Sequence, residues 1–237
     1  MYYDTLAMSR STKGEDVESR LRNFITDRGF PCVGAKSALA RGNLTILVAR
    51  DIASSWDDVP ISQSLVAFAK TYRADPFPFQ SLAVIFQDPG RLTEEAFETS
   101  MWERLQSLSD KDAWLGQDHD SRVSDDAGSP HFSMSFGGEA IFVVGLHPGA
   151  SRPARRFERS VLVFNPHDQF EQLRAAGQYE GLRKSILERD LALSGTPNPM
   201  LVRFGQGSAA SQYSGRHVAE DWKCPFTART GRVSNDN

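Results

Sequence analysis

The spacing of apolar residues along the chain predicts helices and strands that alternate through its first half. Apolar positions recur at the three- and four-residue spacing of an amphipathic helix. This pattern predicts helices from Glu15 to near Gly29 and over residues 62–74 and 93–109. Between them, nearly uninterrupted apolar runs predict buried strands over residues 44–50 and 81–88.

The second half of the chain contains a hairpin signature. In FSMSFGGEAIFVVGLH, the apolar residues Phe132, Met134 and Phe136 alternate with serines, and a Gly137–Gly138 pair follows. A wholly apolar run then leads to His147. Alternation, a glycine turn and a second apolar run predict two antiparallel strands, the second of them central in the sheet.

A further strand and two helices are expected after the hairpin. Residues 160–166 read as a strand, and a helix should follow at once, with Asn165 as its N-cap and Pro166 at its first position. Another helix is expected over residues 179–193. By contrast, PCVGAKSAL (31–39) predicts an extended or turn segment.

These elements together predict an α+β fold. Alternating strands and helices favour parallel pairing, whereas the hairpin requires antiparallel pairing. We therefore expect a single domain over residues 15–226, with a mixed β-sheet, a central hairpin and flanking helices. Residues 1–14 and 227–237 are expected to be flexible tails, and the polar stretch 110–130 is typical of a covering loop or of disorder.

Composition and charge place the chain among soluble globular proteins. Hydrophobic residues make up 40% and charged residues 24% of the 237 residues. A net charge of −3 gives no overall attraction to nucleic acid or to anionic membranes. Two cysteines, no signal peptide and no membrane-spanning stretch predict a cytoplasmic protein.

Three histidines are candidates for chemistry. His147 ends a buried strand, where a rigid imidazole can ligate a metal, and the alternative is a histidine at the edge of the core that bonds to a carbonyl. His167 lies at a helix start, whose positive end favours a neutral imidazole suited either to coordination or to capping. His131 is the third candidate, and His119 and His217 are expected to be solvated.

An arginine cluster follows the strand that ends at His147. Guanidinium groups at Arg152, Arg155 and Arg156 can bind haem propionates, a nucleotide phosphate or a substrate carboxylate, or they can form a solvated turn. No HExxH, CxxC, phosphate-loop or GxSxG motif is present in the sequence. Cys224, in WKCPF, is either a thiolate ligand or a buried structural cysteine.

An ordered series of motifs resembles the YqcI/YcgG family over nearly the whole chain. The series comprises PCVGAKSAL (31–39), FSMSFGGEAIFVVGLHPGASRPARRF (132–157), LVFNPHDQFEQLR (162–174), NPML (198–201), SQYSGR (211–216) and WKCPF (222–226). The resemblance implies a b-type haem bound through an imidazole, with dioxygen or peroxide as oxidant. Characterised members are haem-dependent N-hydroxylases that act on guanidines.

The resemblance implies a haem-dependent monooxygenase that hydroxylates a guanidine or amine nitrogen of arginine or a related small molecule. His147 is the expected axial ligand, with His167 as the alternative. The arginine cluster is expected to meet the propionates, and an electron donor or peroxide is the expected partner. Candidates for binding a guanidinium substrate are Glu139, Asp168 and Glu171. The alternatives are a non-catalytic haem-binding or haem-sensing protein, and a metal-free anion- or nucleotide-binding protein.

Overall fold

The computed structural model describes residues 16–87, 90, 92–200 and 203–229. At its centre lies one five-stranded sheet in the order β1-β2-β5-β4-β3. Strands β1 and β2 are parallel, and all other neighbours are antiparallel. The strands are β1 (Leu44–Ala49), β2 (Ser81–Phe86), β3 (Met134–Phe136), β4 (Glu139–Leu146) and β5 (Ser160–Pro166). The predicted α+β class with a mixed sheet is confirmed.

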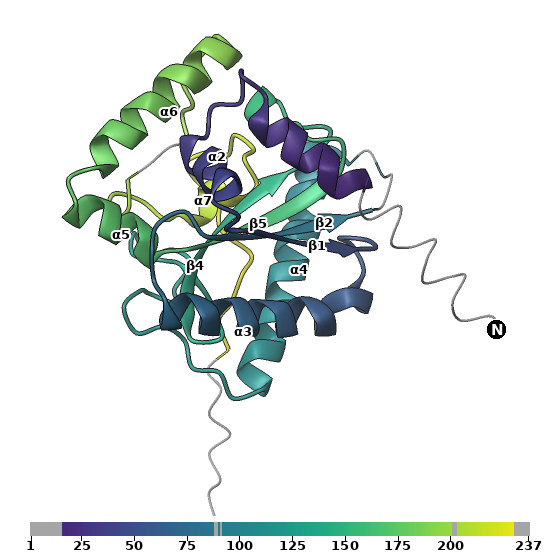
Figure 1. Cartoon of the computed structure of the whole chain (residues 1–237). Coiled ribbons are helices and arrows are strands. Elements are labelled where there is room, and N and C mark those ends of the chain that lie inside the picture. The colour runs from purple at the N-terminus through teal and green to yellow at the C-terminus, as the bar shows by residue number, and fades with distance from the viewer. Residues whose placement is uncertain (1–15, 88–89, 91, 201–202, 230–237) are drawn as a thin grey trace, which may run out of the picture.

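Helices cover both faces of the sheet (Figure 1). One face carries α3 (Asp58–Ala74) and α4 (Glu94–Trp114), and the other carries a first helix at residues 16–26, α2 (Val33–Ala40), α5 (Asp168–Ala175) and α6 (Tyr179–Ser194). Short elements η1 (Ser55–Asp57), η2 (Pro153–Arg155) and α7 (Ala210–Tyr213) complete the order. The chain therefore forms three layers around one sheet.

Strand β2 divides the hydrophobic core into two clusters because it is buried on both faces. Leu82, Val84 and Phe86 pack in the cluster that includes α3 and α4. Ala83 and Ile85 pack in the cluster built on the helix at residues 16–26. Successive side chains of a strand point to opposite faces, so the continuous apolar run of β2 supplies both clusters.

The predicted hairpin forms, but it lies at one end of the sheet. Gly137 and Gly138 connect β3 to β4 with φ angles of 59° and 76°, a left-handed backbone that glycine adopts without strain. The carboxylate of Asp112 accepts the Gly137 N–H at 3.0 Å. The second hairpin strand, β4, is interior as expected, because it pairs with both β3 and β5, whereas β5 takes the middle position of the sheet.

Two local predictions were wrong. Residues 33–40 form helix α2 rather than an extended segment, because the Cys32 Sγ caps its start by accepting the Ala35 N–H. Helix α5 begins at Asp168, with His167 rather than Asn165 as its N-cap. Strand β5 continues through Pro166, which pairs with Ile141. The helix can therefore begin only after Pro166.

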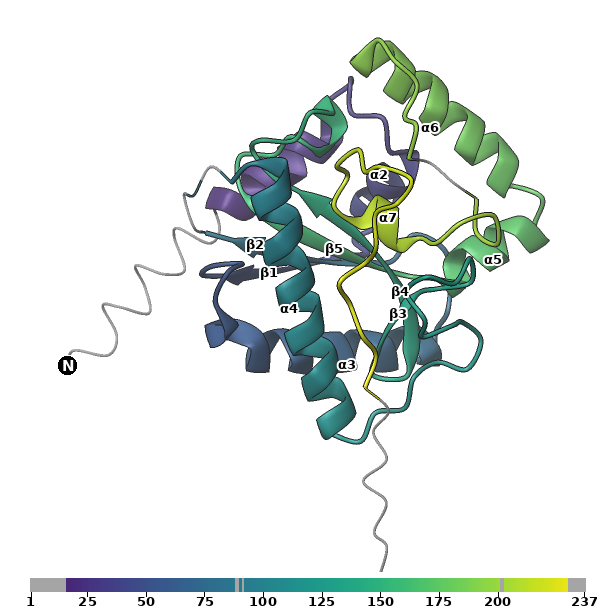
Figure 2. The ribbon, with the colours of Figure 1, turned by 180° about the vertical axis from the view of Figure 1, so that it is seen from behind.

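The segment after α7 runs along α4 (Figure 2). Thr227 donates its N–H to Gln106 of α4 at 2.9 Å, and Arg216 pairs with Glu98 of the same helix. Residues 227–229, placed in the tail from sequence, thus lie against the body of the protein, whereas residues 1–14 and 230–237 are outside the described part.

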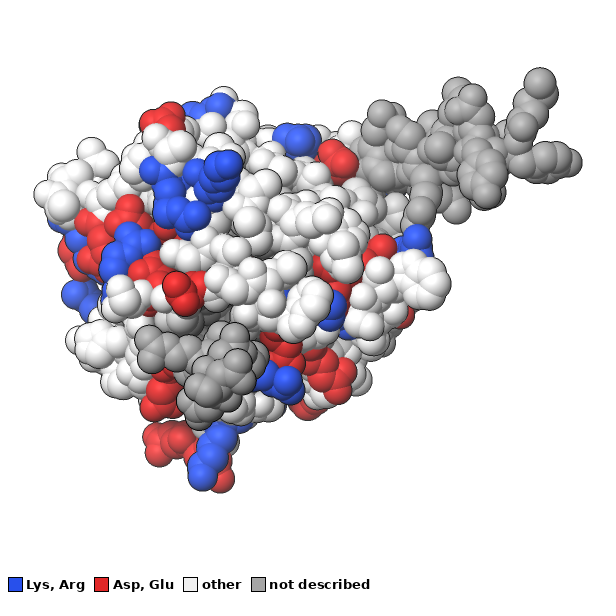
Figure 3. Space-filling model, turned by 90° about the horizontal axis from the view of Figure 1, so that it is seen from below, with Lys and Arg blue, Asp and Glu red and all other residues white. Residues whose placement is uncertain are grey.

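No helix within the described ranges is long and apolar enough to cross a lipid bilayer. On the face shown in Figure 3, acidic and basic side chains are intermingled and uncharged surface lies between them. This mixture agrees with a net charge close to zero and gives that face no broad basic surface.

Candidate functional site

A cavity of about 360 Å³ lies between the sheet and helix α6. Apolar side chains form most of its lining, among them Phe142, Val144 and Val163 from the sheet and Leu182, Ile186 and Leu187 from α6. Helices α2 and α5 contribute further walls. Its size and apolar character fall within the usual range for small-molecule sites, about 300–1,000 Å³. We refer to it as the large cavity because its lining is the most extensive of the cavities described, although its volume is not the greatest.

Helix α6 packs poorly without an occupant in the large cavity. Of its sixteen residues, Asp190 alone is fully buried. The apolar residues Leu182, Ile186 and Leu187 face the cavity and are only half-buried. A helix on a globular protein normally buries an apolar stripe against the core, so this arrangement fits a bound ligand that completes the packing.

His167 stands in the wall of the large cavity. It follows Val163 and Asn165 in the alternation of β5, and all three line the cavity. The residue is 8% exposed, and neither ring nitrogen has a hydrogen-bond partner. The ring lies 4.3 Å from that of Phe204. Burial lowers the pKa of His167, so its imidazole is neutral and has a lone pair available to a metal.

His147 lies on the opposite face of the sheet. It continues the alternation of Val143 on β4, which packs in the α3–α4 cluster. Its ring stacks on Phe97 with centroids 4.3 Å apart, and its Nδ1 is buried without a partner. Burial lowers the pKa of His147 to about 4. His147 does not line the large cavity.

The three arginines of the cluster, like the two histidines, do not all lie at the large cavity. Arg152 and Arg155 line the large cavity, whereas the exposed Arg156 does not. The Arg155 guanidinium donates hydrogen bonds to the carbonyls of Gly145, Tyr213 and Gln212, so it stabilises the local backbone. Arg152 pairs with Asp190, and its Nε is buried without a partner. Arg152 therefore retains a donor for an anionic group in the cavity.

Comparison with known protein families identifies the family of this chain. The model for the YqcI/YcgG family matches residues 21–227. The chain belongs to the YqcI/YcgG family. No curated protein matches it, and neither does any solved structure.

In this YqcI/YcgG protein, a second cavity of about 370 Å³ adjoins His167. It is lined by Asp168 and Glu171, two of the residues expected to bind substrate. The Glu171 carboxylate lies 3.6 Å from the Nε2 of His167. Asp168 and Glu171 are therefore close to the imidazole, but they do not line the large cavity.

Glu139, the third residue expected to bind substrate, is already paired with a cationic side chain of the protein, that of Arg122. Its carboxylate accepts a hydrogen bond from Arg122 at 2.7 Å, and Asp120 binds the same guanidinium. Burial raises the pKa of Glu139, while the nearby Arg122 opposes that shift. This ion-pair cluster joins the polar loop before β3 to the start of β4.

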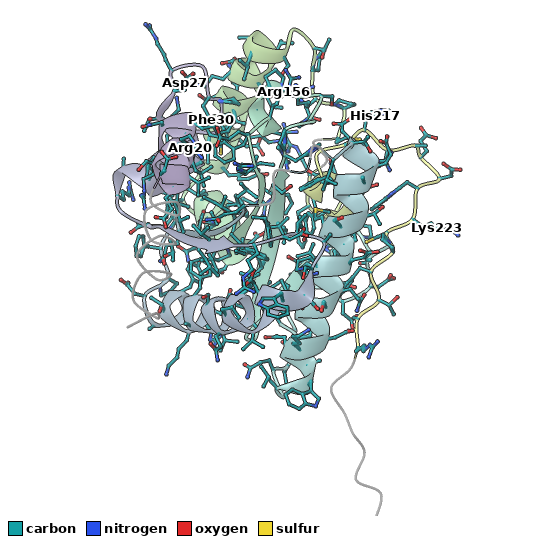
Figure 4. The ribbon with its side chains drawn as sticks, turned by 90° about the vertical axis from the view of Figure 1, so that its right-hand side faces the viewer. Arg20, Asp27, Phe30, Arg156, His217 and Lys223 are labelled. Atoms are coloured by element: carbon teal, nitrogen blue, oxygen red, sulfur yellow. The ribbon has the colours of Figure 1, made fainter. Side chains whose placement is uncertain are left out.

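The remaining candidates lie apart from the large cavity. Cys224 is in an open groove formed with the C-terminal segment, and burial raises the pKa of its thiol to about 12, which disfavours a thiolate. His217 is exposed on the same segment, on the outer side of α4 (Figure 4). His131 is exposed with its ring 5.3 Å from that of Phe204, and His119 is also exposed.

No sequence pattern pointed to Asp190 or Cys32, both of which line the large cavity. Asp190 sits within the predicted helix 179–193 as one of several charged residues, and only the packing of α6 reveals that it is buried. Cys32 lies before a helix that the sequence did not predict. A site assembled from α2, β5 and α6 depends on long-range packing that local patterns do not encode.

Proposed function

We propose that this YqcI/YcgG protein binds b-type haem in the large cavity, with His167 as the axial ligand, and hydroxylates a nitrogen of a guanidine or amine substrate. One observation carries the proposal: the buried imidazole of His167 has no hydrogen-bond partner and lies in the wall of the large cavity. Because this cavity separates α6 from the sheet, none of the apolar residues of α6 is fully buried. The catalytic part rests on the family resemblance.

The residues of the large cavity fit a porphyrin. The sheet side offers Phe142 and Val144, and α6 offers Ile186, so two apolar surfaces face each other across the gap. Arg152 offers its buried Nε to one porphyrin carboxylate, and Arg155, although its guanidinium bonds backbone carbonyls, adds positive charge for the other. Within the described ranges, no cluster of His, Cys, Asp and Glu could hold a bare metal ion, but haem iron needs only one axial side chain.

Each side chain then has a defined task. When bound, haem supplies the iron that activates the oxidant. His167 stays neutral because burial lowers its pKa, and the Glu171 carboxylate, 3.6 Å from its Nε2, could orient the ring after a small side-chain movement that brings it within hydrogen-bond distance. The apolar walls exclude water from the reacting groups.

Purified protein reconstituted with hemin tests the proposal. We expect a Soret band at one hemin per chain and, with a reductant and dioxygen or with peroxide, conversion of L-arginine to a product that has gained one oxygen atom. A Soret band without turnover of any guanidine or amine would indicate a non-catalytic haem protein. Absence of a saturable Soret band would refute haem binding altogether.

A further inference from the structure

We propose that Asp190 is the specificity-determining residue of the large cavity and binds the cationic group of the substrate. The inference rests on the proposed function, in which a guanidine or amine enters this cavity. It differs from the sequence expectation, which assigned the substrate cation to Glu139, Asp168 and Glu171.

The position of Asp190 is unusual for a helix residue. It is 5% exposed and faces a cavity that is otherwise mostly apolar. Among the described residues that line this cavity, it supplies the one carboxylate. Because burial of an unpaired carboxylate is costly, a buried aspartate on the inner face of α6 needs a cation.

The present surroundings of Asp190 already accommodate a guanidinium group. Its Oδ2 accepts a hydrogen bond from Nη2 of Arg152. The same guanidinium donates to the carbonyls of Thr196, at 3.1 Å, and Pro197, at 3.4 Å. A carboxylate with two backbone carbonyls is a set of acceptors suited to a planar, multiply donating cation.

One oxygen of Asp190 has capacity for a second cation. In the part of the chain that the structure describes, its Oδ1 has a single long hydrogen bond, from the Ser194 hydroxyl at 3.5 Å. A carboxylate has about four lone-pair sites, so Oδ1 can accept from a substrate while Oδ2 keeps Arg152. Arg152 in turn has its buried Nε available for an anionic group of the cofactor.

The charges around the large cavity support the same assignment. Its lining includes Asp190 and four arginines, which are Arg152, Arg155, Arg174 and Arg183. A cationic substrate would be repelled by this excess of positive charge unless an anionic cofactor offsets part of it. Two porphyrin carboxylates would reduce this excess to four arginines against three carboxylates, and Asp190, paired with Arg152, is the one carboxylate that the described lining itself offers to a cation.

The variant Asp190→Asn tests this assignment in the haem-loaded protein. Asparagine has the same shape and keeps one oxygen to accept from Arg152, but it loses the charge. We expect the Soret band to remain, while the Kd for L-arginine rises about tenfold to a hundredfold. KM should rise with kcat less affected. The matched control is Glu188→Gln, on the exposed side of the same helix, which should leave both values unchanged.

A neutral analogue gives a second measurement. L-citrulline carries a urea of similar shape in place of the guanidinium, so the wild type should bind L-arginine far more tightly than L-citrulline. Asp190→Asn should largely remove this preference, and Asp190→Glu, which keeps the charge, should retain it. An unchanged preference in Asp190→Asn would overturn the proposal, as would failure of both variants to fold, since Asp190 would then serve the fold alone.

This test is separable from that of haem binding. Absence of a Soret band in the wild type would refute the cofactor and leave Asp190 to be tested by titration of the apoprotein with methylguanidinium. Saturable binding that is lost in Asp190→Asn would support the cation site without haem. No binding to the wild-type apoprotein would overturn the cation site in that case.

Discussion

At the scale of the residue, the environment of each imidazole decides its role. His147 and His167 are both buried and both lack a partner for a ring nitrogen. They project to opposite faces of the sheet. His167 lies on the same face as Val163, which lines the large cavity, and His147 on the same face as Val143, which packs in the α3–α4 cluster. Both faces of β4 and β5 are apolar, so the sequence predicted buried strands but could not tell which face borders a cavity.

His147 should make the protein sensitive to acid. Burial lowers its pKa to about 4, from 6.5 in the unfolded chain. Below pH 6.5 the unfolded state takes up a proton that the folded state does not, so stability falls as the pH drops. The loss should reach about 3 kcal/mol as the pH approaches the folded pKa of about 4.

Urea unfolding of the wild type and of His147→Leu between pH 7 and about pH 4 measures this contribution. The variant should be less stable at pH 7, because it loses the stacking on Phe97, but its stability should fall less on acidification. His217→Gln, at an exposed position, is the control and should follow the wild type. Equal slopes for the wild type and His147→Leu would contradict the buried neutral imidazole.

At the scale of the element, close packing on the α4 side of the sheet contrasts with loose packing on the α6 side. A Cβ at Gly145 of β4 would lie 2.7 Å from the Phe97 ring and 3.1 Å from the Tyr213 carbonyl oxygen. Gly181 of α6 is exposed to solvent, and a Cβ there would have no atom within 4 Å. The same substitution should therefore have opposite effects at the two positions.

Gly145→Ala should destabilise the fold by about 1–3 kcal/mol, because the core cannot take an added methyl group without shifting Phe97. Gly181→Ala should stabilise it by up to about 1 kcal/mol, since alanine favours the helix and meets no neighbour. Chemical denaturation of the two variants measures the change in the free energy of unfolding and so checks the sign predicted for each. A stable Gly145→Ala protein would show that this face is not closely packed.

Helix α6 should be the least protected helix of the apoprotein. Its one fully buried residue is the charged Asp190, whereas most residues of β4 and β5 are buried. Hydrogen exchange should therefore be faster in α6 than in β4 and β5, and hemin should slow it chiefly in α6. Protection of α6 that is already equal to that of the strands would contradict an incomplete core.

At the scale of the whole molecule, the strands and helices that form the layers were easier to predict from the sequence than the residues that line the large cavity. Apolar periodicity located all five strands and most helices, because each buries a regular face. It missed α2, because PCVGAKSAL was expected to be an extended or turn segment, although the Cys32 cap starts a helix there. The large cavity joins α2, β5 and α6, which are distant in sequence, so its lining emerged only from the assembled fold.

Hemin titration of matched histidine variants tests the central claim most directly. His167→Ala should lose the Soret spectrum of an imidazole-ligated haem and regain it when free imidazole is added, whereas His147→Ala should keep it. Both variants should show native circular dichroism before hemin is added. Retention of the wild-type spectrum by His167→Ala, together with its loss in His147→Ala, would place the iron on the other face of the sheet and contradict the account.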